Sequence, residues 1–155
     1  MEDKRITKTK RALKSALLEL LTTQAFDVIS ITELCKIANV SRITFYTHYK
    51  DKFALLDDIF NDMLIIGKEG YHRRQEENNP ENNLTQGYLN VLDSILSLYY
   101  ERYDFFQHVV PETNPYLAFR FYRILLDTVE SHTDKLKASY SLKYSARQIA
   151  GFICF

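Results

Sequence analysis

The sequence has little of what catalysis or a disulfide framework needs. Its 155 residues include 4 Gly, 3 Pro, 2 Cys and no Trp. The two cysteines form no CxxC pair, which is typical of a reducing compartment, and we expect a cytoplasmic protein. The sequence contains no Walker loop and no GxGxxG, GxSxG or HExxH motif, so we expect neither enzymatic activity nor a cofactor.

Long apolar runs are also absent. The longest stretch without a charged residue is residues 82–92, and a bilayer-spanning helix needs roughly 20 apolar residues. We therefore expect no membrane association, and the charged amino terminus predicts no secretory signal. His72, His108 and His132 have no partner at metal-ligand spacing, so we expect no metal site.

The charges are unevenly distributed. The total is balanced, with 20 Lys and Arg against 20 Asp and Glu. Residues 1–56 contain 10 basic and 6 acidic residues, whereas residues 57–155 contain 10 basic and 14 acidic ones. A net charge of +4 in one part and −4 in the other indicates two functional parts with different partners.

The apolar residues recur at intervals of three and four, which predicts an all-α protein. Asn- and Pro-containing breaks lie at residues 76–83 and 111–115. We expect a helical domain over residues 1–52, followed by a larger helical domain over residues 53–155. The expected helices begin near residue 6 and then cover residues 31–37, 42–49, 52–74, 84–102, 104–110 and 115–133, with a last one from residue 144.

The second and third of these helices form a predicted helix-turn-helix. Ser30 and Glu33 have the spacing of a capping box, in which each side chain bonds the other residue's backbone amide. Asn39 tolerates the left-handed conformation that a tight turn requires. Ser41 and Asp51 are suited to cap the two helices that follow.

One face of the helix over residues 42–49 is suited to a DNA groove. Phe45 and Tyr49 are four residues apart and are expected to pack inward. The outward or rim positions then hold a cation, hydroxyls, a phenol and an imidazole, but no acid: Arg42, Thr44, Tyr46, Thr47 and His48. Arg can bind a guanine edge, and the others can donate to phosphate oxygens. Lys52 begins the next helix, whose positive end also favours a phosphate.

The segment from Lys10 to Leu56 resembles the DNA-binding region of the TetR/AcrR family of bacterial transcriptional regulators. The matching residues are ITELCKIANVSRITFYTHYKDKFALL, with the spacing Y-x-H-[FY]-x-x-K. One departure is Asn39, where the family usually has glycine. The resemblance implies a helix-turn-helix repressor that binds a double-stranded, palindromic operator as a homodimer and responds to a small-molecule effector.

The resemblance also implies roles for individual residues. Arg42 and Thr44 would touch bases or nearby phosphates, whereas Tyr46, His48 and Lys52 would clamp the DNA backbone. The full set of expected DNA-binding residues is Thr32, Ser41, Arg42, Thr44, Tyr46, Thr47, His48 and Lys52. Two readings remain open for the basic residues at 4–14, namely a phosphate-tracking arm and a solvated helix face.

The rest of the chain is less informative. Residues 57–155 hold 16 of the 21 aromatic residues, which suits either a core or an effector pocket. The pocket candidates are Tyr88, Tyr99, Phe105, Phe119 and Tyr122. The chain ends within an apolar run, so we expect either a truncated chain or an end buried against a partner. The alternative function is a protein–protein interaction adaptor or co-activator on a TetR-like scaffold.

Overall fold

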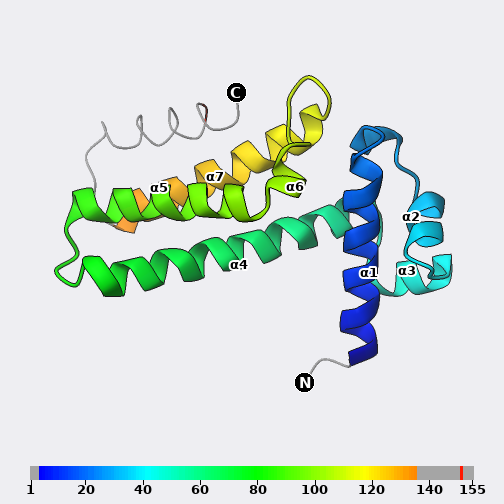
Figure 1. Ribbon diagram of the computed structural model, residues 1–155, viewed down its shortest axis with the longest axis horizontal. Helices are drawn as coiled ribbons and strands as arrows, with labels where there is room; N and C mark the ends of the chain where they lie inside the picture. The colour runs from blue at the N-terminus through cyan, green and yellow to red at the C-terminus, as the bar shows by residue number, and fades with distance from the viewer. Residues whose placement is uncertain (1–3, 136–150, 152–155) are drawn as a thin grey trace. The chain divides into compact units, whose positions relative to one another are not determined.

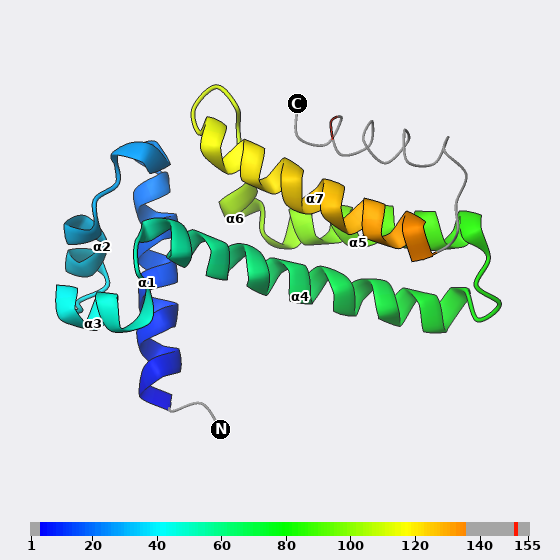
Figure 2. The same ribbon diagram turned by 180° about the vertical axis from the view of Figure 1, so that it is seen from behind.

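The computed structural model describes residues 4–135 and residue 151. These residues form helices that are joined by turns and loops (Figures 1 and 2). The described residues contain no β-strand, which confirms the predicted all-α class. The helix expected from residue 144 lies outside the described residues, apart from residue 151. The elements are α1 (Lys4–Leu21), η1 (Phe26–Val28), α2 (Ile31–Ile37), α3 (Arg42–His48), α4 (Lys52–Asn78), α5 (Leu84–Glu101), α6 (Tyr103–Phe106) and α7 (Pro115–Lys135).

The chain divides into two compact units, Met1–Asp62 and Met63–Phe155. The first unit includes the early part of α4, which is bonded to α1. Lys14 Nζ lies 3.1 Å from Asp58 Oδ2 and 2.5 Å from Asp62 Oδ2.

The first unit is built on the apolar side of α1. Leu13 and Leu17 are fully buried, and they share the core with Leu34 of α2 and Phe45 of α3. Helix α1 packs against α2, and α2 packs against α3. Figures 1 and 2 both show the two short helices on the same side of α1. Helices of seven residues are marginal alone, so this shared core holds them in place.

The ends of the short helices are fixed by the predicted caps. Ser30 and Glu33 form the complete capping box, with the Ser30 amide 2.9 Å from Glu33 Oε2. Ser41 Oγ accepts from the Thr44 amide at 3.0 Å. The Ala54 amide donates to Asp51 Oδ1 at 2.8 Å. Asn39 has a φ of 53°, which confirms the left-handed turn residue between α2 and α3.

In the second unit, three helices lie side by side. The part of α4 from Met63 onward, α5 and α7 are adjacent in both views, with α5 antiparallel to the other two (Figures 1 and 2). Asn90 of α5 is fully buried and donates to Gln75 and Asn78 of α4, at 2.5 Å and 2.8 Å. Helix α6 is shorter than the predicted 104–110 helix, because the backbone turns after Phe106.

No helix within the described part of the chain is long and apolar enough to cross a membrane.

Candidate nucleic-acid interface

Helix α3 presents an exposed face opposite its buried residues. Phe45 is fully buried and Tyr49 is 5% exposed, as predicted from their spacing. Arg42 and Thr47 are exposed, and Tyr46 keeps 48% of its surface accessible. The other predicted contact residues are also reachable: Thr32 and Ser41 are exposed, whereas Thr44 and His48 are half-buried. The helix-turn-helix thus brings together seven of the eight expected residues on α2, α3 and the turn between them.

Several hydroxyl groups on this face already have partners within the protein. Thr47 Oγ1 donates to the Ile43 carbonyl at 2.9 Å, which uses its only hydrogen. Ser41 Oγ and Thr44 Oγ1 lie 2.8 Å apart, so one of these two hydroxyls donates to the other. The sequence alone predicts that Thr44 and Thr47 can both donate to phosphate oxygens. In this conformation, Thr47 can only accept, whereas Arg42, Tyr46, His48 and one hydroxyl of the Ser41–Thr44 pair keep a hydrogen to donate.

Lys52, the eighth expected contact residue, is bonded within the protein. Its ammonium group donates to the carbonyls of Phe26, Asp27 and Ile29, at 2.9, 2.7 and 2.9 Å. It also lies 4.9 Å from the centroid of the Phe26 ring. These three bonds use all the hydrogens of the ammonium, so none is left for a DNA phosphate. Lys52 instead holds the η1 turn against the first turn of α4.

The environment of Lys52 fits this internal role. Desolvation lowers the pKa of the Lys52 ammonium, and the negative charge of Asp27 partly opposes that change. The Lys52 ammonium loses water of hydration here, and three carbonyl oxygens replace that water as hydrogen-bond acceptors. The side chain is therefore a positioning element, since the segment it fixes leads directly into α2.

The basic face of α1 is divided between solvent and internal ion pairs. Lys4, Arg5, Lys8 and Arg11 are exposed. Lys10 and Lys14 lie 3.9 Å and 3.1 Å from Asp58 Oδ2. Asp58 and Asp62 therefore neutralise part of the basic segment. Only the outer side of α1 remains suited to a phosphate.

Asp58 also contacts the end of α3. Tyr49 donates its phenolic hydrogen to Asp58 Oδ2 at 2.6 Å. Burial alone would raise the pKa of the Asp58 carboxyl, but the hydrogen bonds from Tyr49 and Lys14 and the charges of Lys14 and Lys10 outweigh it. The net pKa lies below its usual value of 3.8. Asp58 thus stays ionised and joins α1, α3 and α4 within the first unit.

Sequence reasoning missed Ile43, which is 82% exposed on α3. Ile43 belongs to neither the inward nor the outward set predicted from the sequence. Ile43 precedes Phe45 by two residues, which places it about 200° around the helix from that buried ring. The spacing alone could therefore have indicated an outward side chain. An exposed aliphatic group between Arg42 and Tyr46 can contact the methyl group of thymine.

The aromatic residues suggested for an effector pocket do not share one environment. Phe105 is buried in the core, whereas Phe119 is 56% exposed. Tyr99 stacks on Phe106 with centroids 5.4 Å apart. Two clefts in the second unit are lined by other residues, one beside Arg74 and one around the loop after α4. Among the residues whose positions are described, no group of three or more His, Cys, Asp or Glu could hold a metal ion.

Comparison with known proteins identifies one similar segment. The chain is 40% identical over 58 residues to an uncharacterized HTH-type transcriptional regulator, YxbF, of Bacillus subtilis (strain 168). This segment is 37% of the chain but only 14% of the relative, so the chain spans a small part of that protein's length. No family model matches the chain.

A solved structure has a similar fold over most of the chain. The dihydroxyacetone kinase operon activator DhaS gives a TM-score of 0.54, with 22% sequence identity. The similarity covers 94% of this chain and 80% of that one. At this level of identity the similarity concerns the fold, and it agrees with the all-α, helix-turn-helix architecture.

Proposed function

We propose that the protein is a sequence-specific DNA-binding transcriptional regulator of the TetR/AcrR type. The observation that carries the proposal is the α2–α3 helix-turn-helix with Arg42, Ile43 and Tyr46 on its exposed face. Helix α3 enters the major groove, where Arg42 and Ile43 contact base edges. Tyr46, His48, Thr32 and the Ser41–Thr44 pair contact the DNA backbone. The similarity to a helix-turn-helix regulator supports this proposal.

Lys52 has no direct contact with DNA in this proposal. Because it fixes the η1 turn to α4, it keeps the amino end of α2 in place. Thr47 contributes only as an acceptor, since its hydrogen is bound to Ile43. The contact set is therefore smaller than the one expected from the sequence, and it is centred on α3.

The regulator acts as a cytoplasmic homodimeric repressor on a near-palindromic operator and responds to a small effector. One short recognition helix buries too little surface for tight specific binding, so two copies are needed. An exposed apolar stripe on α5 supports pairing, because Leu89, Leu96 and Tyr100 are spaced to share one side of the helix. The same stripe also favours the alternative, an adaptor that docks a partner protein.

The experiment is selection of bound duplexes from a random library by the full chain, followed by affinity measurements on the selected site. We expect a two-fold symmetric site whose affinity falls as the salt concentration rises. Arg42→Ala should weaken preference at one base pair of each half-site by about 1–3 kcal/mol. Arg102→Ala, in the second unit, is the charge-matched control and should leave binding unchanged.

Two results would overturn this function. One is the absence of any enriched site at low salt with folded protein. The other is an enriched site whose recognition is unaffected by Arg42→Ala. Sedimentation of the free protein tests the homodimer separately, and a stoichiometric protein partner combined with no DNA site would favour the adaptor.

A further inference from the structure

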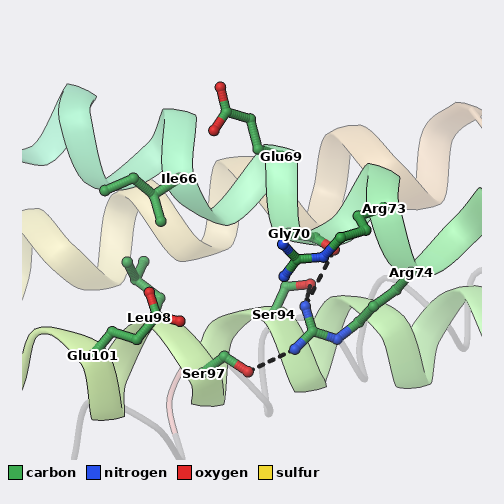
Figure 3. A pocket seen from close by; sticks show the side chains of 9 residues that line it. All are labelled: Ile66, Glu69, Gly70, Arg73, Arg74, Ser94, Ser97, Leu98 and Glu101. Carbon is green, nitrogen blue, oxygen red and sulfur yellow. Dashed lines mark hydrogen bonds between the residues drawn. The ribbon is translucent and has the colours of Figure 1, made fainter.

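A polar cleft lies in the second unit between α4 and α5. It has a volume of about 140 Å³ and is lined by polar and charged residues of both helices, with Ile66 and Leu98 at its apolar end. Figure 3 shows Arg73 and Arg74 reaching into this region from α4, opposite Ser94 and Ser97 of α5. None of the five aromatic residues considered above lines the cleft.

Arg74 is held in a fixed position by uncharged partners. Its Nη1 donates to the Gly70 carbonyl at 3.2 Å and to Ser94 Oγ at 3.4 Å. Its Nη2 donates to Ser97 Oγ at 2.7 Å. Ser94 is 5% exposed and donates to the Asn90 carbonyl at 2.7 Å, so its hydroxyl is fixed too. Ser97 only accepts from Arg74 and retains its own hydrogen for donation.

Two adjacent guanidinium groups in this cleft make no ion pair with the described carboxylates. Within the described residues, neither Arg73 nor Arg74 has a carboxylate within 4.0 Å. Figure 3 shows the Glu69 carboxylate turned away from both, and Glu101 at the other end of the cleft beside Leu98. Arg73 is exposed and Arg74 is half-buried, so water only partly screens their positive charges, and an anion bound between them would be attracted to both.

A glycine beside the cleft, Gly70, also bears on the position of Arg74. Gly70 lies in the interior of α4, where glycine costs about 1 kcal/mol relative to alanine. A Cβ atom at this position would come within 3.2 Å of Arg74 Nη1. Glycine leaves room for the Arg74 guanidinium where it folds back over the helix to face α5.

We propose that this cleft binds a small anion through a carboxylate or phosphate group, held by Arg73, Arg74 and the free hydrogen of Ser97. Guanidinium groups suit both oxyanions because their planar N–H pairs match two oxygen atoms. The volume is below the 300–1,000 Å³ of sites for drug-sized molecules, so the ligand is a small metabolite or its anionic end. The anion is the effector class of the proposed regulator, and only this regulatory consequence rests on the function proposed above.

The test is calorimetric titration of the full chain, without DNA, using inorganic phosphate and, separately, acetate, succinate and citrate. We expect saturable binding of phosphate or of at least one carboxylate. Arg73→Gln and Arg74→Gln should each weaken that binding about tenfold or more, because each removes a charged hydrogen-bond donor. Ser97→Ala should weaken it less. Arg102→Gln removes a positive charge outside the cleft and should bind as the wild type does.

Arg73 makes the experiment decisive even if Arg74→Gln fails to fold. Its side chain is exposed, so Arg73→Gln should keep the wild-type melting temperature. The proposal is overturned if no probe binds saturably, or if folded Arg73→Gln binds the probe as tightly as the wild type. If the full chain binds the anion but selects no DNA site, that result contradicts the proposed function and leaves the anion site standing.

Discussion

The ammonium group of Lys52 donates to the carbonyl of Ile29 at 2.9 Å, across 23 residues of sequence. Ile29 ends the η1 turn and is followed directly by the Ser30 cap of α2. This single bond therefore connects the start of α4 with the segment that positions the supporting helix. Lys52 is therefore bonded within the scaffold that carries α2 and α3.

Lys52→Met should destabilise the protein by about 1.5–3 kcal/mol, because it removes three charge-assisted hydrogen bonds. The Phe26 carbonyl keeps the Ile29 amide as a donor, whereas the carbonyls of Asp27 and Ile29 lose the Lys52 donor. Urea unfolding of the full chain measures the change. Lys50→Met is the matched control, since Lys50 is exposed two residues earlier and should change stability by less than about 0.5 kcal/mol. Equal effects of the two variants would contradict the scaffold role of Lys52.

Asp58 should make the stability depend on acid pH. Its folded pKa is below the unfolded value, so its stabilisation is complete above about pH 4 and is lost as the pH falls through the folded pKa. Asp58→Asn should therefore be less stable than the wild type at pH 7, and the difference should shrink at pH 3. Tyr49→Phe, which removes only the donor hydroxyl, should reproduce part of this loss. A difference that is the same at both pH values would count against the assignment.

Asn39 tests the turn between α2 and α3. Its φ of 53° costs roughly 1–2 kcal/mol for an ordinary residue and more for a β-branched one. Asn39→Gly should retain or raise the free energy of unfolding, whereas Asn39→Val should lower it by at least about 1 kcal/mol. Thermal melting of the two variants side by side measures this. If valine is tolerated as well as glycine, the turn does not have the conformation described.

Substitutions of Ile43 and Phe45, both in α3, should affect DNA binding and folding separately. Ile43→Ala should leave stability within about 0.5 kcal/mol of the wild type, because the side chain is exposed. It should still weaken binding to the selected duplex, mainly at a thymine-containing position. Phe45→Ala should instead destabilise the fold by about 3–5 kcal/mol. Wild-type affinity and sequence preference in Ile43→Ala would remove Ile43 from the interface.

Local signals in the sequence identified most of the helix-turn-helix. The Ser30–Glu33 box, the Ser41 and Asp51 caps and the left-handed Asn39 all depend on residues within four positions of one another. Such interactions are visible in a linear sequence because their geometry is set by the helix itself. The same holds for the buried spacing of Phe45 and Tyr49.

The tertiary structure decided what the local signals could not. The three carbonyl partners of Lys52 lie 23–26 residues away, and Asp58 meets Lys14 from another helix. Arg74 and Ser97 face each other only because α4 and α5 are antiparallel, which places residues 23 positions apart side by side. The sequence alone therefore determined the all-α class, the capped ends of the short helices in the first unit and the buried side of α3. Long-range packing determined which charged side chains are bound internally and which remain available to a partner, because that depends on the position of every neighbouring helix.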